Sequence, residues 1–255
     1  MNPGPGEWLA TLPGWEAASV SRLDGGLSHT AWKLDAGDRA AVLKIDREAR
    51  SAPANSRARE AAAQAQAAGA GLAAPVLWHS GEGILTAWLE GESLSAGMFR
   101  DEAVVAGAGR ALRRLHALPP AGFDFDLEAW ASHYRAELEA AGRFDAPARR
   151  HWQRLVAADT TGPRVFSHND PVPANLVLAD SRIRFIDFEY AGDNSPWFDL
   201  AALVTEARLD ARRRALLLDA YLDGSEPPAG RLGDYVATYR ALVGLWSKLR
   251  LPVVP

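Results

Sequence analysis

Residues 165–178 read V-F-S-H-N-D-P-V-P-A-N-L-V-L, and residues 183–190 read I-R-F-I-D-F-E-Y. The first stretch ends in a short apolar run and the second begins with one, and the residues between them include Asp180 and Ser181, which favour turns. Two apolar runs separated by a short polar turn predict a β-hairpin. This hairpin is the feature from which the rest of the sequence is best interpreted.

Three polar side chains flank the predicted hairpin. Asn175 is expected to begin its first strand and Asp187 to end its second, so strand pairing is expected to place them nearly opposite each other. Two oxygen donors at one end of a hairpin suit Mg²⁺, which takes few protein ligands and shares the rest with phosphate oxygens. Asp170 lies in the preceding loop, where it could take a proton from an attacking hydroxyl group. An Asp, an Asn and a second Asp in this order are the parts used in kinase-type phosphoryl transfer. The alternative is a polar turn capped by Asp170, which leaves the carboxylate opposite Asn175 unexplained.

Four motifs occur in order along this part of the chain: H-N-D at 168–170, Asn175, I-D-F-E-Y-A-G at 186–192 and W-F-D-L-A at 197–201. Together they resemble the aminoglycoside phosphotransferase and choline kinase superfamily. The form of the last two motifs is most similar to the choline/ethanolamine kinase and bacterial thiamine kinase branches. The resemblance extends from about residue 20 to residue 248.

The resemblance implies a bilobal, protein-kinase-like α+β fold. A small antiparallel β-sheet lobe, residues 1–88, would bind the nucleotide, and a larger, mainly helical lobe, residues 89–255, would carry the catalytic and substrate-binding groups. The segment 86–89 resembles the hinge between such lobes, and Thr86 and Trp88 are therefore candidate nucleotide-binding residues. The cofactors implied are ATP and Mg²⁺.

The resemblance also implies roles for the loop residues. Asp170 would be the catalytic base, Asn175 and Asp187 would bind the metal, and His168 would brace the loop, while Asp199 is expected to cap a helix or to brace the same loop. Members of the superfamily usually have Gly where this chain has Ala174. If that position needed a positive φ, Ala would cost about 1 kcal/mol.

The pattern along the chain agrees with two differently built lobes. Short apolar runs separated by Gly-containing turns predict five strands at 18–23, 30–34, 41–45, 76–79 and 84–89. Helix-favouring composition and apolar periodicity predict helices at 57–68, around 104–115, and at 127–141, 147–157, 199–206, 211–222 and 231–250.

The loop between the first two predicted strands, residues 23–31, reads L-D-G-G-L-S-H-T-A. Gly25 and Gly26 would let backbone N–H groups approach phosphates, so we expect these residues and Ser28 to contact the nucleotide. A plain Gly-Gly hairpin turn is the alternative.

Lys44 lies within the apolar strand A-V-L-K-I, where a lysine needs a partner. Glu60, early on the next helix, is the expected partner, because kinases hold the phosphate-binding lysine with a helix glutamate. Glu48 and Arg59 are competing charges nearby, and simple surface alternation is the alternative for Lys44.

Glu189, Tyr190 and Trp246 are the candidate substrate residues. A carboxylate and aromatic faces suit a cation, at about 0.5–2 kcal/mol for each cation–π contact. Packing in the core is the alternative for the aromatic side chains.

We therefore expect an ATP-dependent kinase that phosphorylates a hydroxyl group of a small, cationic alcohol, with thiamine as the first choice and choline or ethanolamine as the second. An aminoglycoside or amino-sugar phosphotransferase is an alternative. A nucleotide-binding pseudokinase that acts as a regulator is another, but a pseudokinase has usually lost one of the residues corresponding to Lys44, Asp170, Asn175 and Asp187.

Composition limits the remaining possibilities. The chain has 255 residues, a net charge of −4 and no cysteine. It has no basic excess for binding nucleic acid, no apolar run near the roughly 20 residues of a membrane span, and a start unlike a signal peptide. We expect a cytoplasmic monomer or homodimer with no membrane partner. The histidines outside the H-N-D motif, His29 among them, show no metal-ligand spacing and are expected to be structural or on the surface.

Overall fold

The computed structural model describes residues 5–23, 29–47, 55–158, 161–224 and 231–250. The chain has the expected mixed α+β architecture and divides into two compact units. The first consists of Met1–Glu92 and Val177–Glu189, and the second of Ser93–Leu176 and Tyr190–Pro255. The first unit thus extends beyond residue 88 and includes most of the hairpin, which the sequence had placed in the second.

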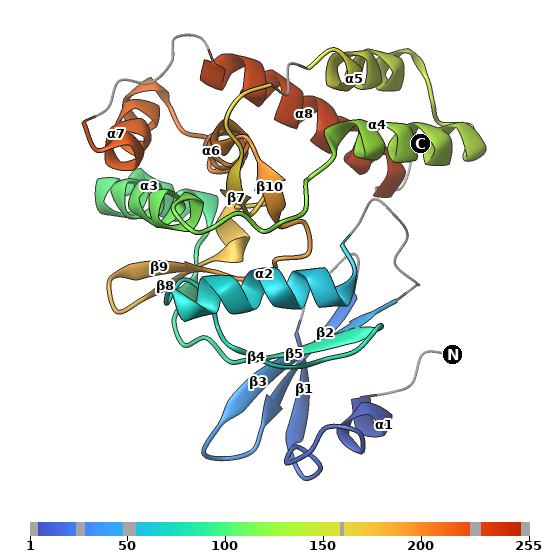
Figure 1. Ribbon diagram of the computed structural model, residues 1–255, viewed down its shortest axis with the longest axis vertical. Coiled ribbons are helices and arrows are strands. Elements are labelled where there is room, and N and C mark those ends of the chain that lie inside the picture. The colour runs from blue at the N-terminus through green and yellow to red at the C-terminus, as the bar shows by residue number, and fades with distance from the viewer. Residues whose placement is uncertain (1–4, 24–28, 48–54, 159–160, 225–230, 251–255) are drawn as a thin grey trace. The chain divides into compact units, whose positions relative to one another are not determined.

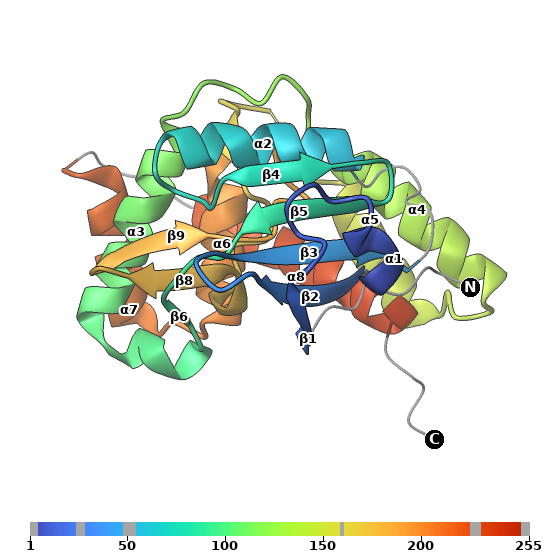
Figure 2. The same cartoon turned by 90° about the horizontal axis from the view of Figure 1, so that it is seen from below.

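A five-stranded antiparallel sheet forms most of the first unit (Figure 2). Its strands, in their order across the sheet, are β1 (Ser19–Leu23), β2 (His29–Asp35), β3 (Ala40–Asp46), β5 (Gly83–Ala87) and β4 (Val76–His79). These are the five strands that the sequence predicted, with ends that differ by at most two residues.

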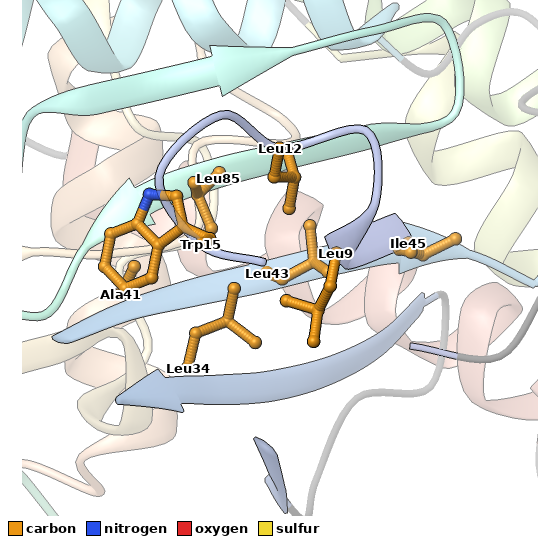
Figure 3. Close-up of a cluster of buried hydrophobic side chains, with 8 residues drawn as sticks. All are labelled: Leu9, Leu12, Trp15, Leu34, Ala41, Leu43, Ile45 and Leu85. Carbon is orange, nitrogen blue, oxygen red and sulfur yellow. The ribbon is translucent and has the colours of Figure 1, made fainter. Parts of the chain in front are cut away.

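Alternating burial along β3 separates the core from the candidate site. Ala41, Leu43 and Ile45 are buried, whereas Lys44 between them points to the opposite face and is only partly covered. Figure 3 shows the core cluster: Leu9, Leu12, Trp15, Leu34, Ala41, Leu43, Ile45 and Leu85. Full burial of a leucine or isoleucine contributes about 1.5–3 kcal/mol. Part of this cluster comes from the short helix α1 (Pro5–Leu9) and the turn after it, which the sequence did not predict.

Helix α2 (Arg57–Gly69) packs against β4 (Figures 1 and 2). The side chain of Ser56 caps its first turn by accepting a hydrogen bond from the backbone N–H of Arg59. Small buried alanines line the helix, which lets its backbone approach neighbouring elements closely.

The predicted hairpin is confirmed. Its strands are β8 (Leu176–Ala179) and β9 (Arg182–Phe185). The two turn residues, Asp180 and Ser181, have φ values of 48° and 59°. Positive φ at both central positions is what a two-residue type I′ turn requires, and it matches the twist of the two strands.

Two close contacts explain why the hairpin belongs to the first unit. The backbone N–H of Phe185 donates to the carbonyl oxygen of Leu72 at 2.7 Å. Gly91, with φ +139°, precedes β6 (Glu92–Ser93), and a Cβ atom at this position would lie 2.5 Å from the carbonyl oxygen of Leu178. Only glycine fits there without a shift of the backbone.

Helices form most of the second unit: α3 (Glu102–His116), α4 (Leu127–Ala140), α5 (Ala146–Val156), α6 (Pro196–Glu206), α7 (Ala211–Leu222) and α8 (Arg231–Arg250). Helix α3 packs against α7, and α8 packs against α4, α5 and α6 (Figure 1). Aspartates cap α3, α4, α5 and α7 by accepting backbone N–H groups of the first turn: Asp101, Asp126, Asp145 and Asp210. No helix in the described ranges is long and apolar enough to cross a membrane.

A short antiparallel pair supports the loop that carries the H-N-D motif. Strand β7 (Val165–Ser167) leads into this loop and pairs with β10 (Gly192–Asn194). The loop ends in a single 3₁₀ turn, η2 (Pro173–Asn175). The sequence indicated β7 only as an apolar run and did not predict β10. Another short 3₁₀ segment, η1 (Ala96–Arg100), precedes α3.

Candidate active site

Lys44 and Asp187 form an ion pair within the first unit. The Nζ atom of Lys44 lies 3.0 Å from Oδ1 of Asp187, and the two side chains are 14% and 20% exposed. Lys44 is held in the middle of β3, opposite Ala31 on one side and Ile84 on the other. Asp187 follows β9 with a φ of 67°, an uncommon conformation for a residue with a side chain. The predicted phosphate-binding lysine and a predicted metal ligand are therefore neighbours.

Glu60 has a different partner from the one expected. Its Oε2 atom accepts from Nη1 of Arg57 at 2.7 Å, and the same guanidinium donates to Asp46 at 2.7 and 3.2 Å. Arg57 and Glu60 are both 1% exposed. Because a buried guanidinium needs compensating carboxylates, Arg57, three residues before Glu60, takes this glutamate. The predicted Lys44–Glu60 pair is therefore wrong: among the described residues, the ion-pair partner of Lys44 is Asp187.

Of the remaining candidate nucleotide-binding residues, the structure describes Thr86 and Trp88. Gly25, Gly26 and Ser28 lie outside the described residues. Thr86 is buried in β5. The backbone N–H of Trp88 donates to the carbonyl oxygen of Ala40 at 2.9 Å, which extends the sheet beyond β5, and Nζ of Lys33 lies 4.4 Å from the centre of the Trp88 ring. A role of Thr86 and Trp88 in nucleotide binding stays a prediction.

Asp170 and Asn175 are joined directly within the second unit. The Nδ2 atom of Asn175 donates to Oδ2 of Asp170 at 3.0 Å and to its carbonyl oxygen at 2.9 Å. The amide nitrogen of Asn175 is thereby committed, and its oxygen is the atom left to contact a cation. Ala174 lies in η2 and is not among the residues with positive φ, so the expected strain at this position does not arise.

The loop is braced by Asp199, which is fully buried. Its two carboxylate oxygens accept the backbone N–H groups of His168 and Asn169 at 2.8 and 2.7 Å. Oδ2 also lies 3.0 Å from Nε2 of His116, whose Nδ1 lies 2.8 Å from the hydroxyl oxygen of Tyr221. Asp199 thus braces the loop, as the sequence allowed, and Ser195 rather than Asp199 is the N-cap residue of α6. The sequence did not point to His116 or Tyr221.

Asn169 fixes the other side of the loop. Its φ is 66°, a left-handed conformation that Asn tolerates better than most residues. Its Nδ2 donates to the carbonyl oxygen of Tyr190 at 2.9 Å, and its Oδ1 accepts from Nδ2 of Asn194 at 2.7 Å. Both the nitrogen and the oxygen of the Asn169 side-chain amide are therefore hydrogen-bonded, which fixes the backbone immediately before Asp170.

The candidate substrate residues lie in different surroundings. Glu189 lies beside Asp187 and His29, and one ligand atom from each of these three residues lies within 4.8 Å of the others. The ring of Tyr190 contacts that of Trp130 edge-on, with centroids 5.4 Å apart. Trp246 lies on α8 and is partly buried. The sequence did not single out Trp130.

Within the first unit, the donor atoms fit a magnesium–nucleotide complex. Asp187 and Glu189 offer the oxygen donors that Mg²⁺ prefers, and Lys44 offers a cation for phosphate oxygens. His29 adds a nitrogen donor beside Asp187, which this chemistry does not require.

The sequence matches the model of a family described as "Phosphotransferase enzyme family" over residues 19–237. Protein LicA of Haemophilus influenzae is 48% identical over 54 residues, which are 21% of this chain and 20% of that protein. A LicA homolog of Metamycoplasma hominis is 25% identical over 166 residues, 63% of this chain and 64% of that protein. The matched part is thus about a fifth of the Haemophilus protein.

Solved structures resemble the chain over most of its length. A choline/ethanolamine kinase family protein from Mesorhizobium loti has a TM-score of 0.74 and 28% identity, covering 97% of this chain and 85% of that one. The choline kinase LicA from Streptococcus pneumoniae has a TM-score of 0.77 and 19% identity, covering 96% and 89%. An aminoglycoside-3′-phosphotransferase of type VIII has a TM-score of 0.70 and 18% identity, covering 94% and 98%. The last two likenesses support the protein-kinase-like fold.

Proposed function

Because the chain belongs to the phosphotransferase enzyme family, we propose that it is an ATP- and Mg²⁺-dependent kinase that phosphorylates the hydroxyl group of a small cationic alcohol. The observation that carries this proposal is the hydrogen bond between Asn175 and Asp170. It joins a metal-binding amide to a proton acceptor in a loop of the form H-x-D-x-x-x-x-N, the arrangement that kinase-type phosphoryl transfer uses.

Each polar residue of the candidate site has a role in this reaction. Asp170 accepts the proton of the attacking hydroxyl group, and Asn175 keeps the Asp170 carboxylate oriented. Asp187 and Asn175 are the proposed ligands of Mg²⁺, which neutralises phosphate charge when bound. Lys44 binds phosphate oxygens. Asp199 holds the backbone on the N-terminal side of Asp170, so that its carboxylate is positioned before the substrate arrives.

We place choline first among the acceptors, with ethanolamine second. This revises the order expected from the sequence, because the structures described above include a choline/ethanolamine kinase family protein and a choline kinase. Glu189 of the first unit offers a carboxylate, and the paired rings of Tyr190 and Trp130 in the second unit offer aromatic faces, and both kinds of group suit a quaternary cation. Trp246 stays a candidate for the same role.

An aminoglycoside phosphotransferase is the second candidate, because the fold is shared with an enzyme of that description over 98% of its length. Its acceptors are also cationic alcohols, so charge alone does not separate the two. The pseudokinase alternative is disfavoured, since Lys44, Asp170, Asn175 and Asp187 are all present.

An acceptor panel tests the proposal. Purified protein is incubated with ATP, Mg²⁺ and one of choline, ethanolamine, thiamine or an aminoglycoside, and the phosphorylated product is measured by mass spectrometry. We expect choline to give the highest kcat/KM. An aminoglycoside as the best acceptor would favour the second candidate, and nucleotide binding without any phosphorylated acceptor would favour the pseudokinase.

A further inference from the structure

His29 is a buried imidazole beside the Lys44–Asp187 pair. It is the first residue of β2 and is 5% exposed. Its Nε2 atom lies 4.0 Å from Oδ2 of Asp187. This separation exceeds the roughly 2.7–3.2 Å of a direct N–H···O hydrogen bond. Two ligands that share one ion at about 2.1 Å each lie about 3.0–3.4 Å apart at octahedral or tetrahedral angles, so these two atoms need to approach by less than about 1 Å to hold one ion.

Glu189 supplies a third donor. One ligand atom each from His29, Asp187 and Glu189 lie within 4.8 Å of one another, and all three residues belong to the first unit. Lys44 contacts Oδ1 of Asp187, whereas Oδ2 is the atom near His29. With a neutral imidazole, the two carboxylates and the one ammonium leave a net charge of about −1, which favours a cation.

We infer that His29, Asp187 and Glu189 form a mixed nitrogen–oxygen metal site that binds Mn²⁺, Co²⁺ or Zn²⁺ more tightly than Mg²⁺. Mg²⁺ prefers an all-oxygen shell, whereas imidazole suits borderline transition metals. The inference deepens the proposed function and rests on it, because the catalytic role of Asp187 comes from that proposal. The metal site itself is measurable without nucleotide or acceptor.

Cobalt is the probe of choice, because its visible absorption depends on the ligand atoms and on their geometry. The wild-type protein is titrated with Co²⁺ in the absence of nucleotide, alongside His29→Ala and Glu189→Gln. A ligand should matter at least as much as the outer-sphere partners of metal ligands, whose loss lowers affinity about 10–100-fold. We therefore expect each substitution to weaken Co²⁺ binding at least tenfold and to change the visible spectrum.

Controls separate ligation from folding. His79→Ala removes an exposed histidine on β4 and should leave both the Co²⁺ affinity and the spectrum unchanged. Glu189 is less buried than His29, so Glu189→Gln keeps the inference testable if His29→Ala does not fold. A Co²⁺ affinity that is unchanged in folded His29→Ala, or in Glu189→Gln, would overturn the inference.

The acceptor panel distinguishes this inference from the proposed function. If choline is phosphorylated with Mg²⁺ but His29→Ala binds Co²⁺ like the wild type, only the metal inference fails. If Co²⁺ binding depends on His29 but no acceptor is phosphorylated, the metal site stands and the kinase proposal fails. A higher affinity of the wild-type protein for Mg²⁺ than for Co²⁺ would also contradict the stated preference.

Discussion

The ammonium group of Lys44 lies 3.0 Å from Oδ1 of Asp187. This ion pair links the middle of β3 to the segment that follows β9, the second strand of the hairpin. In the proposed reaction these two groups have other partners, because Lys44 binds phosphate and Asp187 binds the metal. In the structure the charge of each group is neutralised by the other. Nucleotide binding is therefore expected to replace the Lys44–Asp187 ion pair with a contact between Lys44 and phosphate and a contact between Asp187 and the metal.

Lys44→Met should weaken Mg-ATP binding about tenfold or more, since a hydrogen bond to a charged group contributes about 1.5–3 kcal/mol. Calorimetric titration with Mg-ATP measures the effect. Lys248→Met is the matched control, because it removes a lysine whose ion pair with Asp145 lies on the surface of the second unit. Wild-type affinity in Lys44→Met would contradict a phosphate-binding role.

His116→Phe should destabilise the protein by about 1–3 kcal/mol, because it removes a hydrogen-bond partner from the fully buried Asp199 carboxylate. Since Asp199 also holds the backbone N–H groups of His168 and Asn169, kcat should fall while the KM for ATP stays close to the wild-type value. Chemical denaturation and steady-state kinetics measure the two effects.

The Tyr221→Phe variant tests the outer part of the same network. It leaves Asp199 with all its donors and removes only the hydroxyl group next to Nδ1 of His116, so its effects should be smaller. His79→Ala, at an exposed position, is the control for both variants. A His116→Phe variant within about 0.5 kcal/mol of the wild type, with unchanged kcat, would show that the network does not position the loop.

Two of the five tyrosines should resist ionisation at alkaline pH. Burial, and then the negative charge of Asp199, raises the pKa of Tyr221. Burial, and then the charge of Asp170, raises the pKa of Tyr239. An unfolded tyrosine ionises near pH 10, so the unfolded chain loses these protons first. The resulting stability is fully present below about pH 10 and is lost as the pH rises above it.

Tyrosinate absorbance followed during an alkaline titration checks this expectation. Tyr221 and Tyr239 should ionise only together with the loss of native circular dichroism, and Tyr221→Phe should lower by one the number of tyrosines that ionise in that step. Ionisation of all five tyrosines near pH 10 in protein that keeps its native dichroism would contradict the prediction.

Local patterns were sufficient to predict the elements that carry the candidate site. The turn residues Asp180 and Ser181 indicated the hairpin, and the apolar run that contains Lys44 indicated the strand β3. The helices were predicted for the same reason, because helix-favouring composition and apolar periodicity are features of contiguous sequence.

Contacts between distant residues could not be predicted in this way. His116 and Asp199 are 83 residues apart, and nothing in the sequence around His116 indicates its partner. The pairing of Glu60 with Arg57 depends on how deeply Arg57 is buried, which is a property of the tertiary structure. Strand β10 has only three residues, too few to show a period, and is recognisable only by its pairing with β7.

The most direct test of the kinase proposal is the transfer of the γ-phosphoryl group of ATP to choline by the wild-type protein and by Asp170→Asn. Asp180→Asn, in the exposed turn of the hairpin, is the matched control, because asparagine tolerates the positive φ of that position. We predict that wild type and Asp180→Asn form phosphocholine at similar rates. Asp170→Asn should bind Mg-ATP but turn over at least about 10²-fold more slowly, because it lacks the proton acceptor. Absence of phosphocholine with the wild-type protein, or an Asp170→Asn variant that keeps about half of the wild-type kcat, would contradict the account.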